Sequence, residues 1–417
     1  MIKTPKGMRL HIGIFGRRNV GKSSLLNALT RQTVSIVSDV AGTTTDPVEK
    51  PMELLPIGPV IFIDTAGIDD SGILGEMRTA KTKNVFNRTD IAILVTTGKG
   101  WGHFENKLLN EFDARKTPVI VVFNKTDIEQ PSDSLIRELE EKKIPVVRAI
   151  ATESQGIYNL REAIIQKTPQ EIINSSSIIG DLIHPGDLVI LVVPIDKEAP
   201  KGRLILPQVQ TIRDILDSNA TCMVVKEHEL RNTFDKLKCK PAIVVTDSQV
   251  FLKVAADTPD DVLMTSFSIL FARVKGNLSE FVRGSVAIDT LKPGDHVLIN
   301  EACTHHPITD DIGTVKIPRW LTKYVGGKIH FSHSQGHDFP DDLGKYKMII
   351  HCGACMFNRR EVLSRIMHAR RAGIPITNYG LTIAYSLGIF ERALSPFPDV
   401  LEMYRQIKKG TFQRKPL

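Results

Sequence analysis

Eight residues near the N-terminus, Gly16 to Ser23, have the types and spacing of a phosphate-binding loop. They follow the pattern Gly-x-x-x-x-Gly-Lys-Ser, after a short apolar run and before a run with helical periodicity, which is the context that this pattern requires. The glycines let the backbone curl so that its N–H groups can surround phosphate oxygens. Lys22 would then neutralise the β- and γ-phosphates, and the Ser23 hydroxyl would complete the coordination of Mg²⁺.

Three further motifs accompany this loop in the order that a guanine nucleotide site requires. Residues 42–46, Gly-Thr-Thr-Thr-Asp, offer hydroxyl groups for Mg²⁺ and the γ-phosphate. Asp64-Thr-Ala-Gly67 ends an apolar run, which would place a carboxylate near Mg²⁺ and the Gly67 amide near the γ-phosphate. Asn124-Lys-Thr-Asp127 ends another run, and the Asp127 carboxylate can accept the N1 and 2-amino hydrogens of guanine. Adenine lacks these two donors in that arrangement, so we expect Asp127 to select GTP over ATP. Four motifs in this order make a chance match negligible.

A group of cysteines and histidines in the last third of the chain could bind a metal. Cys303-Thr-His305 and His351-Cys352-Gly-Ala-Cys355 each follow a predicted strand, and the carboxyl ends of parallel strands share one edge of a sheet, where ligands bind. A disulfide is disfavoured inside the cell, and three independent buried cysteines are a further alternative. Three thiolates and a histidine fit Zn²⁺ as well as an iron–sulfur cluster. The candidates for a fourth ligand share a nitrogen or carboxylate donor near the cysteines: His305, His351, Asp310 and Asp311.

Alternating strand and helix patterns are expected to position the nucleotide motifs. Strands are predicted at 10–15, 60–64, 91–96 and 119–123, and helices at 23–29 and 135–142 among the segments between them. This alternation predicts the α/β fold class, with a parallel sheet that carries helices on both faces.

Two further α/β blocks follow. The second block has predicted strands at 188–195, 222–225 and 243–246 and predicted helices at 207–216, 227–237 and 249–255. The third has predicted strands at 296–299, 328–332, 347–350 and 375–377 and predicted helices at 265–274, 278–291, 360–372 and 381–387. With the polar stretch 174–177 as a linker, we expect a P-loop GTPase domain at 1–173, a small α/β domain at 178–257 and a third α/β domain at 258–417. The second block carries no nucleotide loop and no metal-ligand spacing, so we expect a structural role for it, such as oligomerisation.

The composition, with 42% hydrophobic and 24% charged residues, is that of an ordinary soluble globular protein. No apolar run approaches the ~20 residues of a membrane-spanning helix, and the N-terminus lacks the apolar core of a secretory signal. We therefore expect a cytoplasmic protein without a membrane partner. The net charge of +7 is spread along the chain, with neither a KH-type loop nor an aromatic platform in a basic stripe, so we expect no nucleic-acid partner. A zinc hydrolase is not expected either, because no His-Glu-x-x-His pattern is present.

Residues 9–168 resemble the Era and MnmE group of P-loop GTPases, in the translation-factor branch of that class. The resemblance implies contacts to GTP or GDP from the residues that match the motifs of the group: Gly16, Asn19, Val20, Gly21, Lys22, Ser23, Ser24, Thr44, Asp64, Gly67, Asn124, Lys125, Asp127 and Ala151. Among these it implies catalytic roles for Lys22, Thr44 and Gly67, and Mg²⁺ coordination by Ser23, Thr44 and Asp64. Asn19 matches the position that binds K⁺ in potassium-stimulated members, so potassium stimulation is expected.

The chain departs from the motifs of this group at three positions. Thr45 replaces an arginine in the first switch motif, and Ile150-Ala151 replaces the usual Ser-Ala of the last guanine loop, of which only the Ala151 amide is needed for the base. Ile68 follows Gly67, where Ras-like enzymes carry a glutamine that orients the attacking water. An apolar side chain cannot do this by hydrogen bonding, so we expect slow intrinsic hydrolysis.

The whole chain resembles the HydF family of [FeFe]-hydrogenase maturation GTPases, because a potassium-type GTPase motif set precedes Cys-x-His and His-Cys-x-x-Cys. The resemblance implies that Cys303, Cys352 and Cys355 hold a [4Fe–4S] cluster, with His305, His351 or Asp310 as the fourth ligand. It implies a homodimer that forms through the second block. It also implies a scaffold that receives a di-iron precursor made with the maturases HydE and HydG and delivers it to the apo-hydrogenase HydA.

Overall fold

The computed structural model describes residues 5–30, 48–65, 80–169, 177–194, 204–302 and 311–410. The chain divides into two compact units, Met1–Ser175 and Ser176–Leu417. The expected linker at 174–177 lies outside the described residues except for Ser177. In the described part of the chain, every helix is too short or too polar to cross a membrane.

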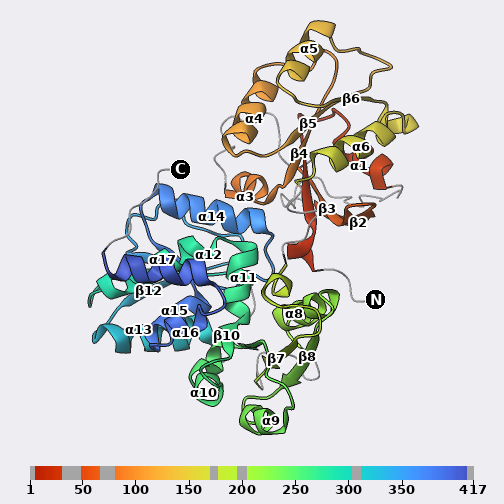
Figure 1. The fold of residues 1–417 in the computed structure, drawn as a ribbon. Coiled ribbons are helices and arrows are strands. Elements are labelled where there is room, and N and C mark those ends of the chain that lie inside the picture. Colours follow the sequence, from red (N-terminus) through yellow and green to blue (C-terminus); the bar gives the residue numbers. More distant parts are fainter. Residues whose placement is uncertain are drawn as a thin grey trace. The chain divides into compact units, whose positions relative to one another are not determined.

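The first unit is built on a six-stranded sheet with the strand order β2-β3-β1-β4-β5-β6 (Figure 1). Its strands are β1 (Leu10–Phe15), β2 (Val48–Leu54), β3 (Gly58–Asp64), β4 (Ile91–Thr96), β5 (Val119–Asn124) and β6 (Val146–Ala149). Neighbouring strands are parallel except β2 and β3, which are antiparallel. The helices are α1 (Lys22–Thr30), α3 (Ala80–Arg88), α4 (His103–Ala114), α5 (Asp133–Glu141) and α6 (Ile157–Lys167). The predicted strands and helices are thus found within a few residues of their predicted ends.

Helices cover both faces of this sheet, and the side chains of one strand therefore divide between two cores. Leu10, Ile12 and Ile14 of β1 pack with residues of α1 and α6 in one core. Phe15 packs in the other core, where its ring lies 4.9 Å from the rings of both Phe86 and Phe112. Because both faces are covered, the central strands are continuous apolar runs, which is the pattern seen in the sequence.

The described residues of the second unit form two four-stranded parallel sheets. The first has the order β10-β9-β7-β8, with strands β7 (Leu188–Val192), β8 (Thr221–Val225), β9 (Ile243–Thr246) and β10 (Leu263–Ser266). The other has the order β12-β11-β13-β14, with strands β11 (His296–Glu301), β12 (His330–Gln335), β13 (Met348–His351) and β14 (Ile376–Asn378). The helices are α8 (Leu206–Asp217), α9 (Leu230–Lys236), α10 (Phe251–Asp257), α11 (Phe267–Lys275), α12 (Leu278–Val286), α13 (Ile317–Val325), α14 (Arg359–Arg371), α15 (Tyr379–Ser386), α16 (Phe390–Ala393) and α17 (Pro398–Lys408).

Strand β10 differs from the sequence expectation. A helix was predicted from residue 265, but residues 263–266 pair in parallel with β9, and the helix begins after them at Phe267. Ser266 caps that helix, because its hydroxyl accepts the N–H of Ile269 at 3.2 Å. The sheet therefore continues past residue 257, where the sequence analysis ended the second block.

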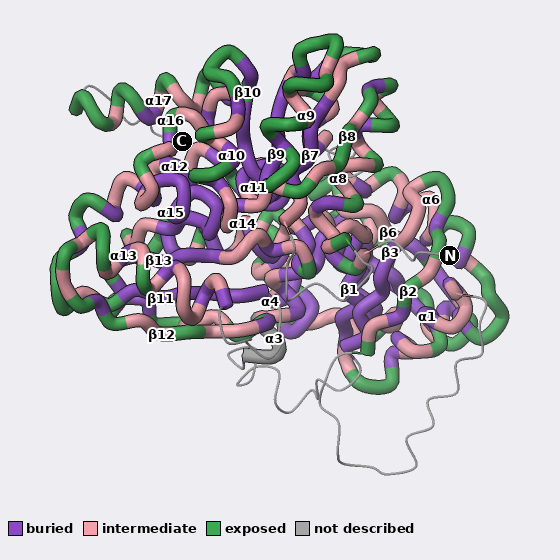
Figure 2. The backbone as a smooth tube through the Cα atoms, turned by 90° about the horizontal axis from the view of Figure 1, so that it is seen from below, coloured by how far each residue is buried: buried purple, intermediate pink, exposed green. Residues whose placement is uncertain are grey.

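One hydrophobic core runs through both sheets of the second unit, from residues of β7 to residues of α17. Figure 2 shows the inner strands β7, β9, β11 and β13 largely buried, whereas the edge strands β8 and β12 are partly exposed. The predicted helix at 278–291 is shorter than expected. It ends at Val286 and continues as a 3-10 turn, Ala287–Thr290.

Candidate nucleotide site and metal-cluster site

The predicted phosphate loop connects β1 to α1, and steric contacts require glycine at both ends of it. Gly16 and Gly21 have φ angles of 142° and 93°, a region that favours glycine. A Cβ atom on Gly16 would lie 2.1 Å from the carbonyl oxygen of Val95, and one on Gly21 would lie 2.2 Å from the side-chain nitrogen of Asn124. These glycines therefore serve the packing of the loop as well as its approach to phosphate.

Lys22, the first residue of α1, is buried and its ammonium group lies inside the loop. Its Nζ donates to the carbonyl oxygens of Gly16 at 2.7 Å and Arg17 at 2.6 Å. The position of the charge agrees with the predicted role of Lys22 toward the β- and γ-phosphates.

The residues predicted to coordinate Mg²⁺ meet where β3 ends. In the sheet, Asp64 of β3 pairs with Ile14 of β1, the strand that leads into the phosphate loop. The Ser23 hydroxyl donates to Asp64 Oδ2 at 3.1 Å. A hydroxyl and a carboxylate at this separation form the oxygen donor set that Mg²⁺ prefers, so the described residues fit the ion. Thr44, the third predicted ligand, lies outside the described residues, as do Gly67, Thr45 and Ile68.

Asn124, at the end of β5, joins two parts of the site. Its Nδ2 donates to the carbonyl oxygen of Val20 at 2.9 Å, and its Oδ1 accepts the N–H of Ala151 at 3.1 Å. In this structure the Ala151 amide that was expected to reach the base thus donates to Asn124. The sequence motif predicts contacts from Asn124 to GTP but gives no sign of this bridge between two loops.

Lys125, which follows Asn124 in the motif, also contacts the phosphate loop. Lys125 has a φ of 58°, and its Nζ donates to the carbonyl oxygen of Asn19 at 2.8 Å. Asp127, Asn19 and Ser24 are exposed. The Asp127 carboxylate is therefore accessible at the edge of the sheet where guanine is expected.

A partly buried ion pair, which no sequence pattern indicated, connects the phosphate loop to α4. Arg17 donates from Nε and Nη2 to the two carboxylate oxygens of Glu105, at 2.9 and 3.1 Å. The Glu105 side chain is 0% exposed, and its Oε2 also accepts the N–H of Gly102 at 2.9 Å. A glutamate in the first turn of a helix usually caps that helix. Because the sequence position of Glu105 suits this common role, it does not indicate the ion pair with Arg17.

The second candidate site lies at the turn that follows β13, beside the end of β11. Cys352 follows β13, and its Sγ accepts the N–H of Ala302 at 3.1 Å and the N–H of Ala354 at 3.4 Å. Ala302 follows β11, so the two strands do converge at the cysteine motif. Cys303, His305 and Asp310 lie outside the described residues. Among the residues that are described, no group of three or more His, Cys, Asp or Glu side chains is placed to hold a metal ion.

The chemistry of the Cys352 turn nevertheless fits an iron–sulfur cluster. Amide N–H groups that donate to a cysteine sulfur stabilise the thiolate, and such hydrogen bonds tune clusters. Burial raises the pKa of the Cys352 thiol to about 12, and the nearby sulfur of Cys355 adds to this effect. Metal binding would have to displace the proton, and the two amide donors would offset part of the resulting charge.

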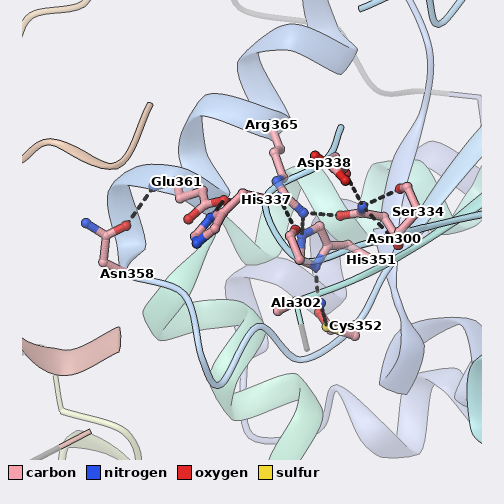
Figure 3. A network of polar contacts seen from close by, with 11 residues as sticks. Asn300, Ala302, Ser334, His337, Asp338, His351, Cys352, Asn358, Glu361 and Arg365 are labelled. Atoms are coloured by element: carbon pink, nitrogen blue, oxygen red, sulfur yellow. Dashed lines mark hydrogen bonds and ion pairs between the residues drawn. The ribbon is translucent and has the colours of Figure 1, made fainter. Parts of the chain in front are cut away.

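His351 belongs to a buried network of polar contacts, shown in Figure 3. Its ring is fully buried, with Nδ1 2.9 Å from the carbonyl oxygen of Cys352 and Nε2 3.2 Å from Arg365 Nη1. Arginine can only donate, so Nε2 is the acceptor and Nδ1 carries the proton. Burial, with the charge of Arg365, lowers the pKa of His351 to about 3. In this arrangement neither ring nitrogen is open to a metal.

Two carboxylates near the cysteines also have defined partners. Asp311, a sequence candidate for the fourth ligand, is buried and caps a helical turn, because its Oδ1 accepts the N–H and hydroxyl of Thr314 at 2.7 and 2.9 Å. Glu301, which the sequence analysis did not select, is buried and accepts the hydroxyl of Tyr379 at 2.8 Å. Only its place at the end of a predicted strand could have indicated it.

Three family models match successive parts of the chain. The 50S ribosome-binding GTPase model matches residues 11–125. The hydrogen maturase F dimerization domain matches residues 178–276, and the hydrogen maturase F tetramerization domain matches residues 279–396. The dimerization and tetramerization domains are both domains of hydrogen maturase F, and they follow the GTPase domain along the chain. The chain belongs to the hydrogen maturase F family. The α/β fold with a P-loop GTPase domain, predicted from sequence, is confirmed, whereas the tetramerization domain was not anticipated.

Curated relatives match the chain over a limited part. It is 38% identical to the tRNA modification GTPase MnmE of Exiguobacterium sibiricum over 158 residues, which cover 37% of this chain and 34% of that protein. It is 35% identical to the GTPase Der of Wolinella succinogenes over 196 residues, which cover 42% of this chain and 41% of that protein. The chain thus spans well under half the length of these relatives. Among solved structures, Aquifex aeolicus Era bound to GDP and aluminium fluoride matches with 23% identity and a TM-score of 0.32, covering 52% of this chain and 93% of that one.

Proposed function

We propose that this protein hydrolyses GTP to GDP and phosphate and matures [FeFe]-hydrogenase as an iron–sulfur scaffold. One observation carries the proposal: a P-loop GTPase domain and two hydrogen maturase F domains follow one another along the chain. The second of these domains contains Cys352 and Cys355 at the carboxyl edge of a sheet. We accordingly propose a GTPase domain at 1–173, a dimerisation domain that starts at 178 and extends past the expected boundary at 257 to include β10, and a cluster-binding domain in the remainder of the chain.

The nucleotide site supports hydrolysis that depends on Mg²⁺. Ser23 and Asp64 would hold the ion, with Thr44 as a further ligand, and the ion would neutralise charge on the β- and γ-phosphates. Lys22 and the loop amides would stabilise the same charge from the opposite side. The exposed Asp127 carboxylate would select guanine.

Water attack on the γ-phosphate is expected to be slow. The Gly67 amide would bind a γ-phosphate oxygen, but the Ile68 side chain cannot orient the attacking water. We propose that K⁺, bound beside the phosphates through Asn19, assists the reaction.

The cysteine turn supports a resident [4Fe–4S] cluster. Cys303, Cys352 and Cys355 would hold it, and when bound it would supply an iron atom whose fourth ligand can exchange. His305, His351 and Asp310 are the candidates for that fourth ligand. The hydrogen bonds that engage both nitrogens of His351 favour His305 or Asp310 over His351. The amides of Ala302 and Ala354 would offset the charge of the Cys352 thiolate.

Assembly and partners follow from the family. Two domains named for dimerization and tetramerization support an oligomer. Strand β8 lies at the edge of its sheet, and Met223 and Val224 on it are exposed, which suits an interface between copies of the chain. We propose a cytoplasmic homodimer that receives a di-iron precursor made with HydE and HydG and delivers it to apo-hydrogenase HydA.

Anaerobic reconstitution with iron and sulfide, followed by EPR of the reduced protein, tests the proposal. The wild-type protein should bind a cluster and activate apo-hydrogenase after exposure to the maturases. Cys352→Ser should lose the cluster signal and keep GTP hydrolysis, because the nucleotide site lies in the other compact unit. A protein that binds only zinc would contradict the scaffold role.

A further inference from the structure

Arg365, on α14, is a buried cation that joins three strand ends of the second unit. It is 3% exposed. Its Nη1 donates to the side chain of Asn300, which lies near the end of β11, and to Nε2 of His351 at 3.2 Å, at the end of β13. Its Nη2 donates to the carbonyl oxygen of Gly336 at 2.8 Å, directly after β12, and to Glu361 at 3.1 Å. Figure 3 shows the guanidinium group at the centre of these contacts.

The two strand residues that Arg365 contacts also hold the backbone of Cys352 on both sides. The Cys352 N–H donates to the carbonyl oxygen of Asn300 at 2.9 Å. The Cys352 carbonyl oxygen accepts the Nδ1 hydrogen of His351 at 2.9 Å. Two residues beyond Asn300, the Ala302 amide donates to the Cys352 sulfur. The direction of the sulfur therefore depends on groups that Arg365 orients.

Only an arginine can make this set of contacts. Its planar guanidinium group presents donors in a rigid fork, whereas lysine is a point charge on a flexible stem. The group also lies over the Phe357 ring, 4.3 Å from its centroid, and Phe357 is in the turn that carries Cys355. Glu361 balances the charge and is held in turn by His337 Nδ1 at 2.9 Å. Burying such a pair is costly and adds little net stability, so a role in orienting neighbouring groups accounts for it better than a role in stability.

We propose that Arg365 is a positioning residue for the cluster site and that His351 transmits its effect to Cys352. Arg365 keeps the His351 proton on Nδ1, where it binds the Cys352 carbonyl, and it holds the side chain of Asn300 beside the same turn. The inference rests on the proposed cluster site. It gives His351 a role beside the cluster instead of one as its ligand.

Reconstituted wild-type and variant proteins test this role. Arg365→Met removes the fork and Arg365→Lys keeps only the charge, so both should change the g values of the reduced cluster and release iron to a chelator several-fold faster. Arg359→Met is the matched control. It alters the same helix and removes donors to the carbonyls of Val274 and Gly276, which lie outside the network, and it should leave the g values and the release rate unchanged.

Two further variants separate the bonds of His351 in case Arg365→Met does not fold. His351→Gln can still accept from Arg365 but loses the donor to Cys352, and His351→Asn keeps that donor but loses the acceptor. Both variants should change the g values, because Arg365 can affect Cys352 through His351 only if both hydrogen bonds of His351 are present.

The possible failures can be told apart. Unchanged g values in the folded Arg365 variants, or in both His351 variants, would overturn the positioning role. The same change in Arg359→Met would overturn it as well, because the effect would then be general loosening. A wild-type protein that binds no cluster would overturn the scaffold proposal, and this inference with it.

Discussion

The ion pair between Arg17 and Glu105 yields a sharp prediction about the phosphate loop. Glu105→Gln keeps the size of the side chain but removes its charge, leaving the Arg17 cation beside an amide. Breaking a fully buried ion pair costs about 3–5 kcal/mol, but the Arg17 side chain is 39% exposed, so water can rehydrate it. We therefore expect a loss of about 2 kcal/mol, in the range of a hydrogen bond to a charged group. In a unit of this size it should lower the unfolding temperature by about 4–8 °C.

Calorimetry of the thermal unfolding of the full chain measures this change in unfolding temperature. The matched control is Glu111→Gln on the same helix. It removes an ion pair with Arg115 in which the glutamate side chain is 40% exposed, and such pairs contribute about 0.3–0.5 kcal/mol. Because the Arg17 carbonyl accepts the Lys22 ammonium, Glu105→Gln should also raise the KM for GTP several-fold, which Glu111→Gln should not. Equal unfolding temperatures for the two variants would refute the reasoning.

Further predictions concern the second unit. Gly284→Ala should destabilise the protein by about 2 kcal/mol or more, although alanine favours helices, because its Cβ would lie 1.9 Å from the carbonyl oxygen of Ile376. Chemical denaturation checks this, and a stabilised variant would mean that α12 does not pack so closely on β14. Burial alone would raise the pKa of Asp289, but hydrogen bonds from Lys408 and two tyrosines lower it below its ordinary value. The carboxylate therefore stabilises the fold above about pH 4, and this contribution is lost as the pH falls through the lowered pKa. Asp289→Asn should reduce the free energy of unfolding at pH 7 by about 1 kcal/mol and so lower the unfolding temperature. This difference from wild type should vanish in acid. A difference that is independent of pH would contradict this account.

The nucleotide site could be predicted from the sequence because its determinants are local. The loop, its glycines and Lys22 are consecutive residues, and the strand before them and the helix after them have clear periodicity. The Cys352 turn also lies at the carboxyl edge of a sheet, as its place after a predicted strand indicated, whereas Cys303 lies outside the described residues. Strand β10 could not be predicted in the same way. It is four residues long, and Thr265 and Ser266 suit the start of a helix as well as a strand, so pairing with β9 decides its structure.

The sequence by itself determined which groups the chain can offer: a phosphate loop, the Asp127 carboxylate that we expect to select guanine, and a cysteine pair. Only the tertiary structure decided how those groups are held. Arg365 lies in a helix rich in charged residues, and its residue type predicts exposure. It is buried because the strand order β12-β11-β13 brings Gly336, Asn300 and His351 to one place. These contacts join residues far apart in the chain, and no local pattern encodes them.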